Sequence, residues 1–390
     1  MQVKRCLTVL VLVLFAMGIV AGCGTNNTNQ QGTPAPQGTE ILVGLNCELS
    51  GGVASYGTNA ANGAKLAFEE INAKGGVLGK QIKVLERDSQ SKTDEAMNVS
   101  ADLVSKGVVA QIGPLVSGAV AACTPVMNEN KVPLIAPAAT APGATVDEKT
   151  GQTFPYIFRA CFLDSDQGVR MAEFAYDTLG LKTAAIYGST SDDYAKGLAK
   201  YFKEAFEAKG GKIVANEGYV TGDKDFKATL TKIKATQPAF IYVPGYYQEV
   251  SILIKQAREL GITAPMGGGD GWDSPDMVTV AGAAALNDTY FTNHYSVQDP
   301  KPAIANFVKA YETKYSKTPD SFAALGYDSA YLLVEAIKSA DSADPVKVAE
   351  ALAKTKDFPG ITGTMTFNEK HNPVKSIVVI EFKDGKLVSH

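Results

Sequence analysis

Two segments, Gly113-Pro-Leu-Val-Ser-Gly118 and Ala136-Pro-Ala-Ala-Thr-Ala-Pro142, decide the fold class of this chain. Each follows a short apolar run and breaks it with small residues and a hydroxyl side chain. This pattern predicts buried strands of an open α/β sheet, in which ligands bind outside the carboxyl ends of the strands. Ser117 and Thr140 would lie just past two such ends, where hydroxyls and free backbone N–H groups can hold a small anion. We therefore expect a binding site for a small carboxylate, without catalytic residues.

From position 41 onward, short apolar runs alternate with helical patterns. In the segment 59–73, Ala64, Ala67, Phe68 and Ile71 recur at the spacing of one helical face. Repeated βα units of this kind predict a parallel sheet covered by helices on both faces. The predicted strands are 41–45, 81–86, 108–112 and 132–135, and the predicted helices are 59–73, 93–106 and 119–130.

The pattern restarts after the Pro-, Gly- and Thr-rich stretch 136–155. Asp384-Gly385 separates two strand-like runs at the end of the chain and predicts a hairpin there. We therefore predict two βα arrays with a cleft between them. The expected strands are 183–187, 212–220, 239–243, 288–292, 363–367, 376–382 and 386–388, and the expected helices are 164–179, 194–208, 225–235, 248–260, 303–315, 322–339 and 345–354.

The first residues read as a targeting segment. Lys4 and Arg5 precede the apolar run 7–20, which is too short to span a bilayer comfortably and is typical of a signal peptide. The run ends in Val20-Ala-Gly-Cys23, which resembles a bacterial lipobox, although Val20 replaces the more usual leucine. In a lipobox the chain is cut before the cysteine, and the thiol carries diacylglycerol. The alternative is ordinary secretion with a cysteine nearby by chance.

The segment 24–39 is polar, uncharged and without apolar periodicity, so we expect a flexible tether. The domain assignment at this end is therefore a signal peptide at 1–22 and a lipidated tether at 23–39. The remaining chain is long enough for two domains. Its 45% hydrophobic and 20% charged residues are ordinary for a globular protein, and the net charge of −4 argues against a nucleic-acid partner.

Of the five cysteines, Cys6 would leave with the signal peptide and Cys23 would carry lipid. Cys47, Cys123 and Cys161 remain, without metal-type spacing. One disulfide with one free thiol and three buried free thiols are both open. We favour the second, because a cysteine among small residues packs as a small hydrophobe.

Several short motifs, taken in order and spacing, resemble a known family. The chain is similar to the type I periplasmic binding proteins, in particular the leucine/isoleucine/valine-binding branch that feeds ABC importers. The resemblance covers nearly all of the chain after the tether. Its carriers are Leu49–Gly57, Ile71–Gly76, Pro137–Pro142, Arg159 with Leu163–Gly168, Gly222–Phe226 and Gly245–Glu249.

The resemblance implies an α/β type I periplasmic-binding-protein fold, with two doubly wound parallel-sheet lobes joined by three hinge crossovers. The crossovers would lie near Arg159, Asn293 and Phe367, and the lobes would close over a ligand by hinge bending. The implied lobes are 40–160 plus 293–367 for lobe 1 and 161–292 plus 368–390 for lobe 2.

The family positions that hold a ligand carboxylate match Ser117 and Thr140. The Ala138 carbonyl matches a position that shares in binding the ligand ammonium. This arrangement suits a zwitterion, since N–H and O–H donors face the carboxylate. The alternative is that the two hydroxyl residues are only turn or N-cap residues.

Asp270, within Met266-Gly-Gly-Gly-Asp-Gly-Trp272, matches the family's acidic partner of the ligand ammonium, which is often glutamate. A buried ammonium without a counter-ion would be very costly. The glycines are expected to let the backbone approach the ligand. A phosphate loop lacks the required spacing here, and an acidic turn residue is the remaining alternative.

Aromatic and apolar contacts of the family also have matches. The aromatic contacts match Tyr56, Tyr194 and Tyr246. If their positions in the family motifs were ignored, the expected role of each would be in the core or on the surface. Trp272, beside Asp270, is expected to support the site more than to contact the ligand. The apolar wall matches Leu115, Val116 and Phe322.

Nothing in the sequence predicts an enzyme. The three histidines, His294, His371 and His390, have no ligand or triad spacing. Asp192-Asp193 and the pair Asp164/Asp166 read as helix N-terminal caps. We therefore expect no catalytic residue, no cofactor and no metal.

These observations favour a lipid-anchored, monomeric solute-binding protein on the outer face of the cell membrane. It would capture a free aliphatic L-amino acid, with leucine, isoleucine or valine leading, and pass it to the permease subunits of an ABC transporter. Its only membrane contact would be the lipid, and it would bind no nucleic acid. The alternatives are the ectodomain of an amino-acid-sensing receptor, or a binding protein for another small amino acid or carboxylate.

Overall fold

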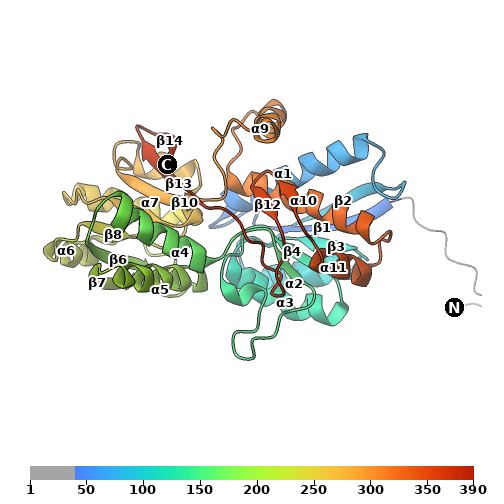
Figure 1. The fold of residues 1–390 in the computed structure, drawn as a ribbon, viewed down its shortest axis with the longest axis horizontal. Coiled ribbons are helices and arrows are strands. Elements are labelled where there is room, and N and C mark those ends of the chain that lie inside the picture. Colours follow the sequence, from blue (N-terminus) through green and yellow to red (C-terminus); the bar gives the residue numbers. More distant parts are fainter. Residues whose placement is uncertain (1–39) are drawn as a thin grey trace, which may run out of the picture. The chain divides into compact units, whose positions relative to one another are not determined.

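The computed structural model describes residues 40–390, so the predicted signal peptide, the tether and Cys23 lie outside the described residues. Strands and helices alternate through most of this range (Figure 1). Helix α1 (Ala54–Ala73) shows why: Ala60, Ala64, Ala67 and Ile71 are all buried on one of its faces. An amphipathic helix of this kind is stable when that face packs against a sheet.

The first sheet contains five parallel strands in the order β2-β1-β3-β4-β5. Adjacent residues along a strand contact different cores: Ile135 packs with α1 and α10 (Ser321–Ser339), and Leu134 packs with α2 and α3. Helices therefore cover both faces of the sheet, as the sequence predicted. The strands are β1 (Glu40–Cys47), β2 (Gln81–Asp88), β3 (Ala110–Ile112), β4 (Leu134–Ala136) and β5 (Ile157–Arg159), and the other two helices are α2 (Thr93–Ser105) and α3 (Ser117–Asn130).

The second sheet contains seven strands in the order β14-β13-β10-β9-β8-β6-β7. Helices α4 and α5 pack on one face and α6 and α7 on the other. Its strands are β6 (Thr183–Ser189), β7 (Lys212–Tyr219), β8 (Phe240–Tyr242), β9 (Met266–Gly268), β10 (Thr289–Asn293), β13 (Val378–Lys383) and β14 (Lys386–Ser389), and its helices are α4 (Asp164–Glu173), continued by a π-turn at Phe174–Thr178, α5 (Asp193–Ala208), α6 (Lys227–Ala235), α7 (Tyr247–Glu259) and α8 (Asp276–Ala281).

The second sheet is parallel from β7 through β10, as predicted, and two antiparallel strands extend one edge of it. Strand β13 runs antiparallel to β10, and β14 runs antiparallel to β13. The predicted Asp384-Gly385 turn joins β13 to β14 directly, and so short a connection can only join antiparallel strands.

The chain passes between the two sheets three times, after β5, after β10 and before β13 (Figure 1). Side chains tie these passages together: Lys375 Nζ donates to Ala160 O at 2.8 Å, and His371 Nδ1 lies 2.9 Å from Ile157 O. The lobe boundaries at 160, 292 and 367 remain a prediction. The remaining elements are α9 (Pro302–Tyr315), α11 (Pro345–Ala353) and the hairpin of β11 (Phe358–Gly360) with β12 (Gly363–Met365).

Cys47, Cys123 and Cys161 are all buried and unbridged, which confirms the favoured prediction for these thiols. Burial raises the pKa of Cys123 and of Cys161 to about 12, so both stay protonated at neutral pH.

Candidate functional site

A small cavity lies where helix N-termini from both sheets meet. Its volume is about 10 Å³, roughly the space of one water molecule. Its residues come from the first turns of α1, α3, α5 and α10, from the loops after β3, β4 and β8, and from the turn Asp270–Trp272. Of the predicted site residues, Thr140 and Trp272 are not in the wall. The wall consists of Tyr56, Leu115, Val116, Ser117, Ala138, Tyr194, Tyr246, Asp270, Gly271 and Phe322.

The N-terminus of α3 forms one side of the cavity. The helix begins at Ser117, and the preceding Val116 supplies no side-chain cap for its first N–H groups. Ser117 Oγ accepts the N–H of Ala141 at 3.1 Å, so its own hydroxyl hydrogen remains available to a ligand. Free N–H groups at a helix N-terminus favour a bound anion.

The loop that carries Thr140 is held by Arg159. The buried guanidinium donates to Ala139 O at 2.8 Å, to Ala141 O at 2.9 Å and to Thr145 Oγ1 at 3.1 Å. Burial lowers the pKa of Arg159 from its ordinary value. Since all these acceptors belong to the same loop, Arg159 fixes the backbone on both sides of Thr140.

Thr140 itself is not part of the cavity wall, and its hydroxyl lies close to Asp164 at the start of α4. Burial raises the pKa of Asp164 well above its ordinary value, and the Thr140 hydroxyl offsets part of this rise. Even so, Thr140 Oγ1 makes no hydrogen bond of good geometry within residues 40–390. The structure therefore brings Ser117 to the cavity but leaves the Thr140 side chain behind it.

Asp270 enters the cavity from the opposite side and is 2% exposed. Its Oδ1 accepts the Tyr194 hydroxyl at 2.9 Å, and its Oδ2 lies 3.0 Å from His294 Nε2. Its backbone N–H donates to Gln167 Oε1 at 2.9 Å. A carboxylate has about four lone-pair sites, so these contacts leave acceptor capacity for a cation.

The glycines before Asp270 make room for aromatic side chains of the protein itself, in addition to the close approach of a ligand expected from the sequence. A Cβ at Gly268 would lie 2.2 Å from the Trp272 indole, and a Cβ at Gly269 would lie 2.5 Å from the Tyr194 hydroxyl. Trp272 is fully buried behind the turn and donates its indole N–H to Val243 O at 3.1 Å. It supports the turn and does not line the cavity.

Four aromatic rings close the cavity. Tyr56 stacks on Phe322 with centroids 4.1 Å apart, and Tyr194 stacks on Tyr246 with centroids 5.1 Å apart. The Tyr56 hydroxyl donates to the Gly271 carbonyl, which belongs to the other sheet's half of the wall. The apolar faces of these rings suit an aliphatic group, and charge enters the wall at Asp270.

Glu48, at the end of β1, anchors the apolar part of the wall. Its fully buried carboxylate accepts the N–H of Leu115 at 3.2 Å and the N–H of Val116 at 3.3 Å. Burial raises the pKa of Glu48 to about 7, and the backbone hydrogen bonds limit the rise. The loop between β3 and α3 is thus held by a carboxyl group that titrates near neutral pH.

Sequence reasoning missed Glu48, Gln167 and His294. Gln167 was visible inside the Leu163–Gly168 motif, but its contact with Asp270 depends on the folded chain. Asp164 was expected to cap a helix; it is instead fully buried, and the capping position of α4 is Leu163. The matching prediction for Asp192 is confirmed, since its side chain accepts the N–H of Ala195 at the start of α5.

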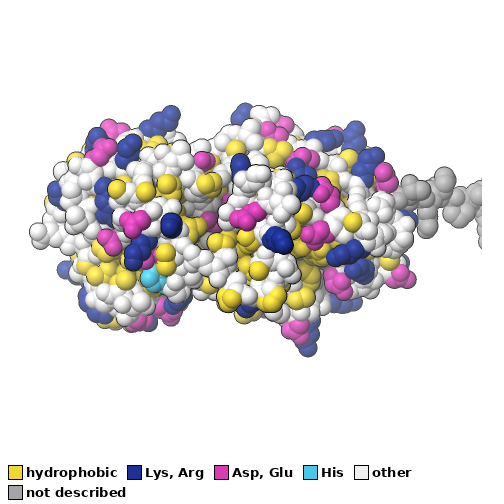
Figure 2. Space-filling view, turned by 90° about the horizontal axis from the view of Figure 1, so that it is seen from above, with side chains coloured by type: hydrophobic (Ala, Val, Ile, Leu, Met, Phe, Trp, Pro, Cys, Tyr) yellow, Lys and Arg dark blue, Asp and Glu magenta, His cyan; other side chains and the backbone are white. Residues whose placement is uncertain are grey.

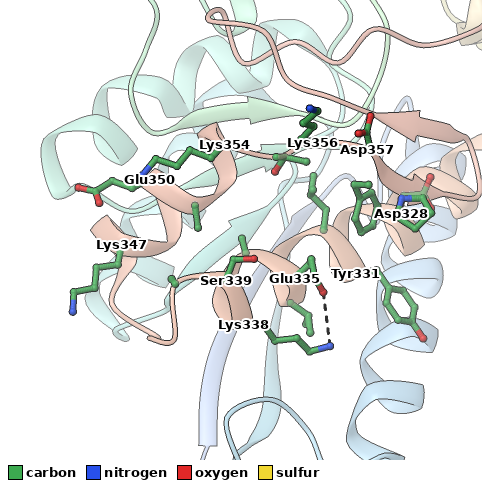
Figure 3. Close-up of a pocket in the computed structure, with 18 of the residues that line it drawn as sticks. Asp328, Tyr331, Glu335, Lys338, Ser339, Lys347, Glu350, Lys354, Lys356 and Asp357 are labelled. Atoms are coloured by element: carbon green, nitrogen blue, oxygen red, sulfur yellow. Dashed lines mark ion pairs between the residues drawn. The ribbon is translucent and has the colours of Figure 1, made fainter.

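A larger groove lies elsewhere, between α10, α11 and the segment that leads into β11 (Figure 3). It contains none of the predicted site residues and is open to solvent. Lysines and acidic residues alternate around it, and Lys338 pairs with Glu335 at 3.9 Å. This mixture of charges gives no preference for one class of ligand.

Charged side chains of both signs are also interspersed over the face seen in Figure 2. Within residues 40–390, no group of three or more His, Cys, Asp or Glu side chains could hold a metal ion. None of the helices in this range combines the length and the apolar character needed to cross a bilayer.

Comparison with known proteins extends this picture. Residues 40–386 match the family described as "Periplasmic binding protein". The leucine-, isoleucine-, valine-, threonine- and alanine-binding protein of Pseudomonas aeruginosa is 32% identical over 330 residues, which covers 85% of this chain and 86% of that protein.

Two solved structures are also similar over 90% of this chain. One is the branched-chain amino acid transporter substrate-binding protein LivJ of Streptococcus pneumoniae in complex with isoleucine, with 40% identity, a TM-score of 0.83 and full coverage of that chain. The other is the leucine-binding protein LivK of Thermotoga maritima, with 34% identity, a TM-score of 0.84 and 97% coverage of that chain.

Proposed function

Because this chain belongs to the periplasmic binding protein family, we propose that it captures a free aliphatic L-amino acid for an ABC importer. Leucine, isoleucine and valine are the leading ligands. The cavity around Asp270 is the proposed binding site, and the chain itself catalyses no reaction in this role.

One observation carries this proposal: the two sides of one small cavity favour groups of opposite charge. The helix N-terminus at Ser117 offers donors on one side, and Asp270 offers carboxylate oxygens on the other. A free α-amino acid has a carboxylate and an ammonium on one carbon, so it can satisfy both sides at once. Tyr56, Phe322 and Leu115 then supply apolar surface for an aliphatic side chain.

The proposed assignment of ligand groups is as follows. Ser117 and the backbone N–H of Thr140 hold the carboxylate, and Asp270 with the Ala138 carbonyl holds the ammonium. Ser117, Thr140 and Ala138 follow strands of the first sheet and Asp270 follows a strand of the second, so a bound amino acid would bridge the halves of the molecule and favour the closed arrangement.

Membership of this family implies an extracytoplasmic location. We further propose that lipid on Cys23 anchors the chain to the outer face of the membrane, and that a monomer delivers the ligand to permease subunits. The support for the anchor is the Val20-Ala-Gly-Cys23 pattern followed by a polar tether.

A thermal-shift screen of the domain 40–390 against the free L-amino acids tests the proposed function, with titration calorimetry on each stabilising ligand. A bound ligand raises stability by RT ln(1 + [L]/Kd), so branched-chain amino acids should give the largest shifts. The desamino analogue 4-methylpentanoate is the control for a simple carboxylate binder. No shift with any branched-chain amino acid, or equal shifts with the analogue, would reject the proposal.

A further inference from the structure

His294 is a buried histidine that directly contacts the proposed ammonium-binding carboxylate. It follows β10, where the chain passes from the second sheet back toward the first, and it is 2% exposed. Its ring stacks on Phe162, with centroids 3.7 Å apart and planes 11° apart. Phe162 lies in the passage after β5, so two interlobe passages hold the imidazole in place.

The proton on this ring can be assigned from its partner. Asp270 Oδ2 lies 3.0 Å from His294 Nε2, and a carboxylate can only accept hydrogen bonds. The Nε2 atom must therefore carry a hydrogen, and Nδ1, which has no partner within residues 40–390, is left as the bare nitrogen of a neutral ring. The Tyr194 hydroxyl holds the other oxygen of Asp270, so the carboxylate is fixed at both ends.

We propose that His294 is a positioning residue that holds the Asp270 carboxylate in the orientation that receives the ligand ammonium. This inference rests on the proposed function, because it assumes that Asp270 is the ammonium partner. It further specifies that the His294 imidazole must be neutral when it contacts Asp270, and that this imidazole lies in one of the passages between the two sheets. Protonated His294 would place a second cation beside the ammonium and would neutralise Asp270 itself.

The charged groups that reach His294 are Asp270 and Lys375. Burial lowers the pKa of His294, the hydrogen bond and charge of Asp270 partly offset this, and the charge of Lys375 lowers it further. Burial also lowers the pKa of Lys375, to about 8, so Lys375 is charged throughout acidic pH. The ring is therefore neutral at pH 7, and ligand affinity should fall as acidification protonates it.

The test compares His294→Phe and His294→Gln with wild type by titration calorimetry. Phenylalanine keeps the stacking but has no donor, whereas glutamine can place its amide N–H near the Nε2 position and cannot be protonated. His294→Phe should weaken L-leucine binding about tenfold or more, as for one lost hydrogen bond to a charged group, and should leave 4-methylpentanoate binding unchanged. His294→Gln should bind leucine well at pH 7 and lose the acid-side decline of wild type.

His371→Phe is the matched control. His371 is the other buried histidine of the passages between the sheets and stacks on Phe158 with centroids 4.2 Å apart, but its ring nitrogen contacts Ile157 O and not the cavity. It should leave leucine affinity unchanged.

Wild-type-like leucine binding by a folded His294→Phe, or the same acid-side decline in His294→Gln, would overturn the inference. If His294→Phe does not fold, the pH profile of His294→Gln decides alone. Failure of wild type to bind any branched-chain amino acid would instead reject the proposed function.

Discussion

The hydroxyl of Tyr56, on the first turn of α1, donates to the carbonyl of Gly271, which directly follows Asp270. The same hydroxyl accepts the N–H of Tyr247 at 3.3 Å. One side chain from the first sheet's half of the molecule thus makes two hydrogen bonds to the second half, at the edge of the cavity. Tyr56 therefore links α1 directly to the turn that carries Asp270.

Tyr56→Phe should weaken leucine binding by about 1–3 kcal/mol, because it removes two hydrogen bonds that join the two halves of the molecule beside the cavity. The ring and its stacking on Phe322 remain. Titration calorimetry measures the loss. Tyr331→Phe is the control, since its hydroxyl donates to Glu70 outside the cavity and its loss should not alter affinity. Equal affinity in the Tyr56 variant would show that this contact contributes nothing to capture.

Asp270→Ala should weaken leucine binding by about 3–5 kcal/mol, since it leaves a buried ammonium without its counter-charge. That is roughly two to four decades in Kd. Asp270→Asn keeps the shape and removes the charge, so it should also bind poorly. Ser117→Ala should cost less, about 1.5–3 kcal/mol, because the backbone N–H at that position remains. Melting curves serve as the folding check, and wild-type-like affinity in Asp270→Asn would place the ammonium elsewhere.

Glu48→Gln should change the pH dependence of stability. Burial raises the pKa of Glu48 in the folded chain from 4.5 to about 7, so the folded state holds this proton more tightly than the unfolded state. The stabilisation from Glu48 is therefore complete below pH 4.5 and disappears as pH rises through 7, a change of ~3 kcal/mol. Glu48→Gln has no group that titrates at this position. Its free energy of unfolding should therefore rise relative to that of wild type as pH increases over this range.

Urea unfolding of both proteins from pH 4 to 8 measures the difference in the free energy of unfolding. Glu350→Gln, at an exposed position on α11, is the control and should follow wild type at each pH. A constant difference between Glu48→Gln and wild type would mean that Glu48 does not titrate in this range.

Cys23→Ala should release the protein from the membrane fraction or block its processing. Two acyl chains hold a protein stably, whereas one binds reversibly, and the variant would have none at this position. Fractionation of cells followed by immunoblotting is the measurement. Membrane retention equal to that of wild type would contradict lipidation at Cys23.

Local sequence patterns determined the βα alternation and the positions of the binding loops. The run before Gly113 and the run before Ala136 are apolar and short, and each is followed by residues that end a strand, so both strands were predictable. Ser117 was predictable as a cavity residue because it starts a helix just past a strand end. These features depend on residues a few positions apart, whose periodicity directly reports burial.

Only the tertiary structure decided which side chains meet. The contact of Asp270 with His294, Tyr194 and Gln167 joins four separate segments of the chain, and no spacing in the sequence encodes it. Thr140 and Asp164 likewise lie together behind the cavity, and the resemblance to a family had placed the Thr140 hydroxyl in the wall. The sequence pattern also did not predict that β13 pairs antiparallel with β10, because the direction of a strand follows from the route of the chain between the sheets. The periodicity of the sequence indicates that a residue is buried. Which residue it contacts depends on the packing of distant elements and on the need to satisfy every buried polar group.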